Sequence, residues 1–292
     1  MKKRPGSGRQ QLSWFVPLAL LLVLGILIVT GILLRGLRQQ HPQITLPEMP
    51  SLPRVLRRQQ AEAPRRQQTT QTPQVAIIID DVGWSTEMAA RLERLGEPLT
   101  ASILPLGETS EHIARKLASC AHMEVMLHMP MEPLPPVRPD NRLCLLTRMD
   151  DGEIAATFEE AISPYAPFVR GINNHMGSAF TTDEARMRTF LLEVKKRNLY
   201  FVDSVTSSRS CGYALAREMG IPTARRRIFL DNSSRPEEIR AQVVELGRLA
   251  EAEGNVVAIG HARETTLQVL AEELPHLKEQ GITLVKVSAV LE

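Results

Sequence analysis

From Val75 onward, short apolar runs alternate with longer amphipathic segments, and this alternation most restricts the fold of the chain. The segments between the runs repeat apolar residues at helical spacing, as Met88, Leu92 and Leu95 do. The predicted strands are residues 75–79, 100–104, 124–127, 168–172, 199–202, 227–230, 256–259 and 283–287. Strands that alternate with helices in this way predict an α/β fold with a parallel barrel, and an open doubly wound sheet is the alternative architecture.

Local signals mark where several of the helices should begin and end. Two pairs have the spacing of capping boxes, Thr181 with Glu184 and Ser234 with Glu237. Three glycines stand where helices are expected to stop, Gly220, Gly254 and Gly281.

The first 74 residues have a different composition and divide into three segments. Residues 1–11 form a basic tail, and residues 12–34 form an uncharged apolar run close to the ~20 residues that span a bilayer. Residues 35–74 are rich in Gln, Pro and Arg and predict a flexible linker. No A-x-A-like cleavage site follows the apolar run, so we expect an uncleaved transmembrane helix. The basic tail favours a cytoplasmic N-terminus, which places residues 75–292 in the periplasm of a single-pass inner-membrane protein.

The charge and the cysteines exclude some classes of function. The formal net charge is +2, and residues 75–292 have no basic face that predicts nucleic-acid binding. The three cysteines, Cys120, Cys144 and Cys211, lack CxxC spacing, which disfavours a zinc knuckle or a thioredoxin-like site. We expect buried thiols that act as small hydrophobic groups, and a disulfide between Cys120 and Cys144 is the alternative in an oxidising compartment.

Polar residues recur at the ends of six predicted strands. They are Asp80 and Asp81, His128, Asn173 to His175, Asp203, Asp231 and Asn232, and His261. A single Asp after a strand is often a helix cap or turn residue, and a lone His is more often structural than a ligand. Six such ends are harder to explain by capping, because the carboxyl ends of barrel strands converge on one mouth where active sites form.

These residue types fit hydrolytic chemistry. Two histidines and a carboxylate form a common open metal site that leaves a position for water. A second carboxylate can act as general base, and a separate histidine oriented by an aspartate can act as general acid. Asp80 and Asp81 can both reach the mouth if the chain leaves regular strand alternation there.

Six motifs in order resemble those of the divergent polysaccharide deacetylase family, across residues 75–292. They are VAIIIDDVG at 75–83, LHMPMEP at 127–133, GINNHMGS at 171–178, FVDS at 201–204, FLDN at 229–232 and IGH at 259–261. The GINNHMGS block is the most specific of them. This family is similar to the NodB-like carbohydrate esterases, so the resemblance implies a distorted (β/α)7 barrel that removes acetyl groups with a divalent metal, usually zinc.

The resemblance also implies roles for individual residues. Asp80 matches the catalytic base and Asp81 a metal ligand of the NodB-like pattern. The late histidine of that pattern is the general acid, which here is His261, with Asp203 as its supporting carboxylate. His128 matches the first histidine of a metal-binding His-x-x-x-His motif.

The sequence departs from the NodB pattern at two places. Glu132 stands where the second histidine of the His-x-x-x-His motif is expected, so the third metal ligand is either Glu132 or His175, and we expect His175. The usual Arg-Pro motif is absent, and Asn173 and Asn174 lie in its region. We expect these two amides to bind substrate, together with Trp84, whose indole can stack on a sugar ring or pack against a loop.

The expected function is removal of acetyl groups from an envelope polysaccharide by a membrane-anchored, metal-dependent hydrolase, with zinc as the expected divalent metal. The alternative is a catalytically inactive NodB-like barrel that binds glycan or serves as a scaffold in the cell envelope. The expected partners are the polysaccharide and the membrane, with no nucleic acid.

Overall fold

The computed structural model describes residues 72–139 and 142–292. The predicted basic tail, the predicted transmembrane helix and most of the predicted linker lie outside these residues. Within the two described ranges, no helix is both long enough and apolar enough to cross a bilayer.

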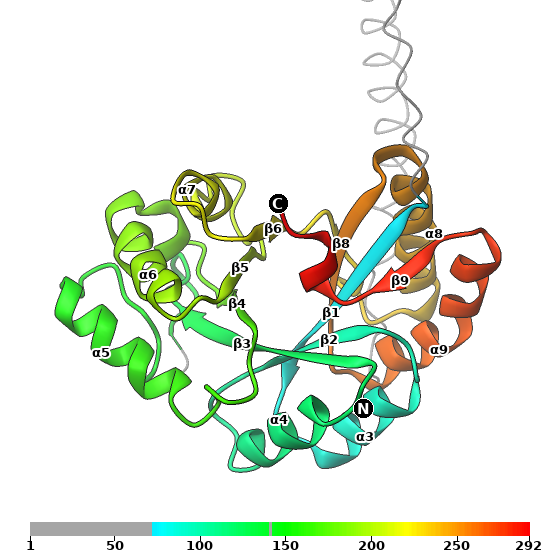
Figure 1. The fold of residues 1–292 in the computed structure, drawn as a ribbon, viewed down its shortest axis with the longest axis horizontal. Helices are drawn as coiled ribbons and strands as arrows, with labels where there is room; N and C mark the ends of the chain where they lie inside the picture. The colour runs from blue at the N-terminus through cyan, green and yellow to red at the C-terminus, as the bar shows by residue number, and fades with distance from the viewer. Residues whose placement is uncertain (1–71, 140–141) are drawn as a thin grey trace, which may run out of the picture. The chain divides into compact units, whose positions relative to one another are not determined.

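Strands and helices alternate along the described chain, as the sequence predicts (Figure 1). The strands are β1 Gln74–Val82, β2 Leu99–Ile103, β3 Met123–Met131, β4 Gly171–Met176, β5 Tyr200–Asp203, β6 Thr223–Arg225, β7 Ile228–Phe229, β8 Asn255–His261 and β9 Thr283–Val285. The helices are α3 Thr86–Arg94, α4 Ser110–Ala118, α5 Asp151–Ile162, α6 Glu184–Lys196, α7 Gly212–Glu218, α8 Pro236–Glu253 and α9 Glu264–Glu279, with short 3₁₀ turns η1 Phe180–Thr182 and η2 Val287–Val290. Each predicted strand has a counterpart, and β6 was not predicted.

The strands form one parallel sheet in the order β6-β5-β4-β3-β2-β1-β8-β7, and β9 also pairs with β1. The curved sheet is a half-barrel whose hydrogen-bonded order ends at β6 and β7. The helices lie along its outer side (Figure 1). The predicted α/β class with a parallel sheet is therefore confirmed, and the sheet forms a half-barrel where the sequence predicts a distorted (β/α)7 barrel.

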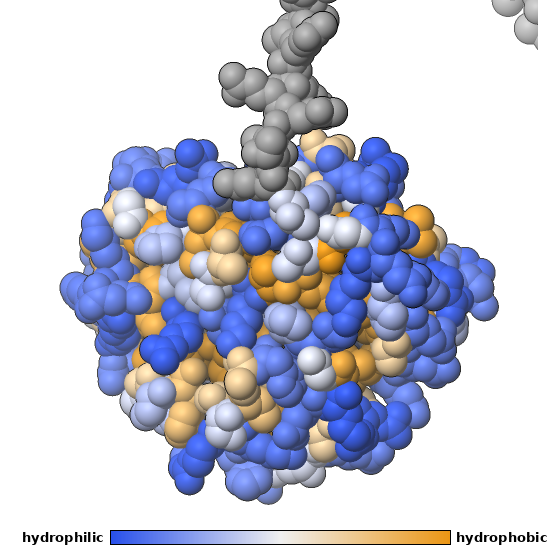
Figure 2. Space-filling model, turned by 45° about the vertical axis from the view of Figure 1, so that its right-hand side comes forward, coloured by the Kyte–Doolittle hydropathy of each residue, from blue (hydrophilic) through white to orange (hydrophobic). Residues whose placement is uncertain are grey.

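Two apolar layers hold the half-barrel together. Alternate residues of β1, such as Val75 and Ile77, pack against the outer helices, while Ala76 and Ile78 face the interior. The interior cluster continues to Val287 of η2, at the end of the sheet where β1 begins. Both faces of the central strands are therefore buried. On the face of the molecule shown in Figure 2, hydrophilic residues cover most of the surface, and apolar residues are visible between them.

The helix boundaries correct two of the predictions. Helix α6 begins after Asp183, whose side chain accepts a hydrogen bond from Arg186 N, while the hydroxyl of Thr181 donates to Gly177 O. Helix α8 begins at Pro236, because proline fits the first turn of a helix, and no side chain caps it. The predicted helix stops are confirmed, since the three glycines that follow α7, α8 and α9 all have positive φ.

Candidate active site

The polar side chains at the strand ends fall into two sets according to the face of the sheet on which they lie. Interior residues of β1, β3 and β8 include Ile78, Met126 and Ile259, so side chains two positions later also face the interior. The inward set is Asp80, His128, Asn173, His175, Asp231 and His261. Asn174 and Asp203 have the opposite alternation and lie on the helix side.

Asp81 joins the inward set because the backbone leaves regular alternation. Its φ is 58°, in the left-handed region, and the register between β1 and β2 shifts between Ile79 and Val82. Such an irregularity redirects a side chain at a strand end. Both carboxylates of the Asp80-Asp81 pair therefore reach the mouth, as the sequence predicts.

Three atoms from three strands form a compact ligand set. Asp81 Oδ1 lies 3.2 Å from His175 Nδ1 and 3.5 Å from His128 Nε2, and the two nitrogens are 3.1 Å apart. A tetrahedral ion with bonds of about 2.0–2.1 Å has ligand atoms about 3.3–3.4 Å apart. Asp81 Oδ1 is buried and accepts no hydrogen bond within the described part of the chain. The donor set and its spacing fit a tetrahedral metal ion with one open position.

Asn173 holds His128 and Asp80 together. Its Oδ1 accepts hydrogen bonds from His128 Nδ1–H, at 2.8 Å, and from the Ser102 hydroxyl, at 2.6 Å. Its Nδ2 donates to Asp80 Oδ1 at 2.8 Å. This arrangement places the His128 proton on Nδ1 and leaves the Nε2 lone pair facing the ligand set. Burial and the charge of nearby His175 lower the pKa of His128 to about 3, so the ring stays neutral, as a metal ligand must.

The two neighbouring carboxylates have opposite acidities. Burial, opposed in part by the Asn173 hydrogen bond and reinforced by the charge of Asp81, raises the pKa of Asp80 to about 7. Burial also acts to raise the pKa of Asp81, but the imidazoles of His175 and His128 outweigh it and hold that pKa well below its usual range. Asp81 is thus a permanent anion, while Asp80 can exchange a proton near neutral pH.

The structure corrects the predicted support of His261. Its Nδ1–H donates to Asp231 Oδ1 at 2.9 Å, and its backbone N–H donates to Asp231 Oδ2. Burial acts to lower the pKa of His261, but the hydrogen bond to Asp231 outweighs it and raises the pKa above its ordinary value. The opposite ring atom, Nε2, lies 3.8 Å from Asp81 Oδ2. Sequence reasoning noted Asp231 at a strand end but did not assign it to His261.

Asp203 points away from the site because side chains alternate between the two faces of β5. It shares the helix side of β5 with Phe201, and its carboxylate accepts hydrogen bonds from Val205 N, Ser210 Oγ and Tyr213 N. It therefore shapes the loop after β5 and the start of α7.

The two asparagines predicted to bind substrate both have side chains that are buried and hydrogen-bonded within the protein. Asn173 is fully buried within the network described above. Asn174 Oδ1 accepts from Ser204 N, and its Nδ2 donates to Met176 O, so it ties β4 to the loop after β5.

Comparison with known proteins agrees with the motifs. Residues 77–291 match the family model described as divergent polysaccharide deacetylase. This chain belongs to the divergent polysaccharide deacetylase family. It is 33% identical over 217 residues to the uncharacterized protein YibQ of Escherichia coli K12. The aligned region covers 74% of this chain and 67% of YibQ. It is 31% identical over 209 residues to an uncharacterized protein of Haemophilus influenzae Rd, covering 70% and 72%.

Among solved structures, an uncharacterized protein of Agrobacterium tumefaciens C58 has the same fold. Its TM-score is 0.70 at 19% identity, and the match covers 76% of this chain and 90% of that one.

In this member of the divergent polysaccharide deacetylase family, His175 lies in the group of three side chains that could hold a metal ion, together with Asp81 and His128. The alternative, Glu132, directs Oε2 to the backbone N–H and hydroxyl of Thr147, at 2.6 and 2.7 Å. Glu132 thereby anchors the loop that follows β3, and it is not part of the ligand set.

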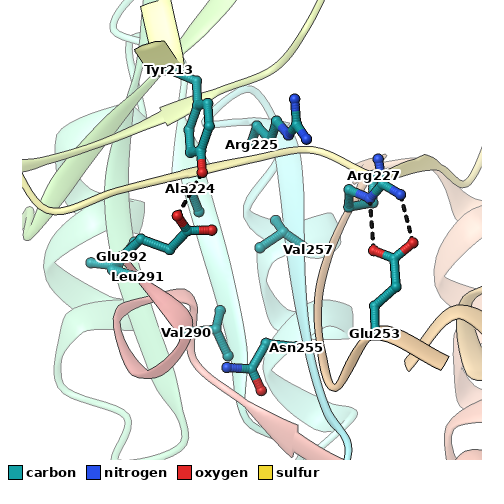
Figure 3. A pocket seen from close by; sticks show the side chains of 10 residues that line it. All are labelled: Tyr213, Ala224, Arg225, Arg227, Glu253, Asn255, Val257, Val290, Leu291 and Glu292. Carbon is teal, nitrogen blue, oxygen red and sulfur yellow. Dashed lines mark hydrogen bonds and ion pairs between the residues drawn. The ribbon is translucent and has the colours of Figure 1, made fainter. Parts of the chain in front are cut away.

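Two hollows differ in their relation to this site. One of about 190 Å³ is lined by Asp81 and His261 together with Trp84, Met88 and Arg263, and Trp84 is 60% exposed there. A larger one, about 320 Å³, includes Asn255, at the opposite end of β8 from His261 (Figure 3). Its polar groups are largely paired, since Arg227 binds Glu253 and the Tyr213 hydroxyl donates to Glu292. The smaller hollow is the one that adjoins the reactive groups.

Proposed function

We propose that this protein is a membrane-anchored, metal-dependent hydrolase that removes acetyl groups from a cell-envelope polysaccharide. The observation that carries the hydrolytic part is the ligand set of Asp81, His128 and His175 at tetrahedral spacing, beside the carboxylate of Asp80 and the imidazole of His261. Membership of the divergent polysaccharide deacetylase family supports the substrate class.

The donor atoms favour zinc. Two imidazole nitrogens and one carboxylate oxygen are ligands that zinc accepts in catalytic sites, where a fourth position stays open. When bound, the ion would polarise the acetyl carbonyl and make a water molecule more acidic.

Asp80 is placed to accept the proton of the attacking water. Its Oδ2 lies 3.5 Å from His128 Nε2, so the carboxylate borders the ligand set, and Asn173 fixes its other oxygen. A base with a pKa near 7 can take a proton at neutral pH and release it again after the reaction.

His261 is placed to donate a proton to the departing amine or alcohol. Asp231 holds the Nδ1 proton, and the raised pKa keeps the ring protonated to higher pH. As the carbon–nitrogen or carbon–oxygen bond of the acetyl group breaks, the Nε2 proton of His261 passes to the leaving sugar atom and acetate is released.

Residues 12–34 are the proposed anchor, with the N-terminus in the cytoplasm and residues 75–292 in the periplasm. Lys2, Lys3, Arg4 and Arg9 support this orientation, because basic residues are retained on the cytoplasmic side. Alkaline phosphatase fused after Glu292 should be active in cells, and a fluorescent protein that folds only in the cytoplasm should stay dark there.

Acetate release from a panel of N- and O-acetylated glycans tests the activity. The full chain, stripped with a chelator and then reloaded with zinc, should regain acetate release that the stripped protein lacks. Full zinc occupancy without acetate release from any glycan of the panel would contradict the proposal and favour the inactive barrel.

A further inference from the structure

The hollow beside His261 combines an exposed aromatic ring with Arg263, a half-exposed arginine whose one ion pair among the described residues, to Asp231, is 3.9 Å long. Its volume of about 190 Å³ is below the ~300–1,000 Å³ of sites for drug-sized ligands, so it suits one sugar unit better than an oligosaccharide. Because His261 also lines this hollow, a sugar bound there lies next to the proton donor of the proposed reaction.

Trp84 is held at the rim of the hollow by a constrained turn. The carbonyl oxygen of the preceding Gly83 accepts hydrogen bonds from the hydroxyls of Thr109 and Ser110, at 2.7 and 3.3 Å. Gly83 has φ of 140°, and a Cβ at this position would lie 2.5 Å from Ser110 Oγ, so only glycine fits. The turn therefore keeps the indole at 60% exposure although Trp is usually largely buried.

Arg263 supplies the cation. Its Nη1 donates to Asp231 O at 3.1 Å, which orients the guanidinium, and the side chain is 49% exposed. The nearest carboxylate oxygen, Asp231 Oδ2 at 3.9 Å, already accepts hydrogen bonds from His261 N and Thr266 Oγ1.

A neighbouring arginine shows the contrast. Arg91 is bound by two carboxylates, Glu87 at 3.0 Å and Glu264 at 2.8 Å. The charge of Arg91 is thus neutralised locally, while Arg263 keeps donors for a ligand.

We propose that this hollow binds a sugar unit that carries an anionic substituent, with the ring against Trp84 and the carboxylate or phosphate on Arg263. Indole faces stack on sugar rings through their apolar side, and guanidinium groups bind carboxylate and phosphate through paired hydrogen bonds. The inference rests on the proposed function and narrows its substrate class to anionic polysaccharides.

Trp84 also provides the readout. The chain has two tryptophans, Trp14 and Trp84, so the full chain with Trp14→Phe reports on Trp84 alone. We would titrate the fluorescence of this protein with N-acetylglucosamine and with its C6-oxidised uronic acid, which differ in one carboxylate. A third titration with N-acetylglucosamine 6-phosphate separates carboxylate from phosphate preference.

The anionic sugars should bind about tenfold or more tightly than the neutral one, and added salt should reduce the difference. Arg263→Gln should remove the preference, and Arg91→Gln, which removes the same charge nearby, should retain it. Equal affinities, a preference that survives Arg263→Gln, or no fluorescence change with any of the three sugars would overturn the inference. The titration requires no turnover, so it separates this inference from a failure of the hydrolase proposal.

Discussion

Asn173 and Asn174 are adjacent in the sequence and both are buried, but they belong to different regions of the molecule. Asn173 faces the half-barrel interior, where it binds a proposed ligand and the proposed base. Asn174 faces the helix layer, where it binds backbone groups at the end of β4 and in the loop after β5. Asp80 and Asp203 repeat this contrast on β1 and β5. A shift of one residue along a strand thus moves a side chain from the proposed site to the helix side of the sheet. The same residue types, Asn and Asp, therefore line the proposed site on one face and hold loops in place on the other.

Replacement of Asp80, the carboxylate that faces the interior, should have the largest effect on catalysis. Asp80→Asn keeps an acceptor for Asn173 Nδ2 but removes the proton acceptor, so we expect acetate release to fall by roughly 10²–10⁴-fold with zinc content unchanged. The matched outward change, Asp203→Asn, should leave the rate of the folded protein within a few-fold. Similar losses of acetate release in both variants would contradict the claim that only the interior carboxylate takes part in catalysis.

The second prediction concerns His261 and the carboxylate that supports it. Asp231 raises the pKa of His261, so Asp231→Asn should lower that pKa and move the alkaline limb of the pH–rate profile to lower pH. We expect the rate at the optimum to fall by roughly 10–100-fold, as for other orienting partners of active-site histidines. If Asp203→Asn shifted the alkaline limb and Asp231→Asn did not, the original sequence assignment would be right.

Replacement of each of the two asparagines by alanine should separate an effect on zinc affinity from an effect on stability. Asn173→Ala removes the acceptor that fixes the His128 proton on Nδ1, so zinc affinity should fall by roughly 10–100-fold. Asn174→Ala should leave zinc affinity unchanged and lower the free energy of unfolding by about 1–3 kcal/mol, because buried backbone groups lose a partner. Competition with a fluorescent zinc chelator and urea denaturation measure the two quantities.

A further effect, on stability and not on catalysis, should appear in the pH dependence of the metal-free protein. The pKa of Asp80 rises from 3.8 to about 7 on folding, so its contribution to stability falls as pH rises through this range. The pKa of His128 falls from 6.5 to about 3, so its contribution rises with pH, and the two offset each other between pH 3.8 and 6.5.

Asp80→Asn removes only the first of these terms. Its free energy of unfolding relative to the unmodified protein should therefore rise by about 3 kcal/mol between pH 4 and 6.5. His128→Asn should give the opposite slope. Parallel stability curves for all three proteins would contradict the proposed environments of both residues.

Much of the fold follows from the sequence, because the apolar runs and their spacing define strands and helices locally. The strand β6 was missed since Thr223–Arg225 is three residues long and lacks an apolar run. The two capping boxes failed because a nearby Asp and a proline compete for the same helix starts.

The sequence predicts that the site lies at the strand ends, but it does not predict on which side of the sheet each side chain lies. Central strands are buried on both faces, so the sequence has no polar–apolar alternation from which to assign inside and outside. This is why the sequence predicts site roles for Asp203 and Asn174 and gives Asp231, although it stands at a strand end, no role. The left-handed turn at Asp81 is likewise fixed by the surrounding structure.

Zinc content tests the central claim most directly, namely that Asp81, His128 and His175 form a metal site and that Asp203, on the helix side of the sheet, takes no part in it. Asp81→Asn is the sharpest variant, since asparagine tolerates the left-handed backbone and removes only the anionic ligand. After reloading and desalting, elemental analysis should give about one zinc per chain in the unmodified protein and in Asp203→Asn, and less than about a tenth of that in Asp81→Asn. Absence of zinc from the reloaded unmodified protein, or equal zinc in Asp81→Asn, would contradict the account.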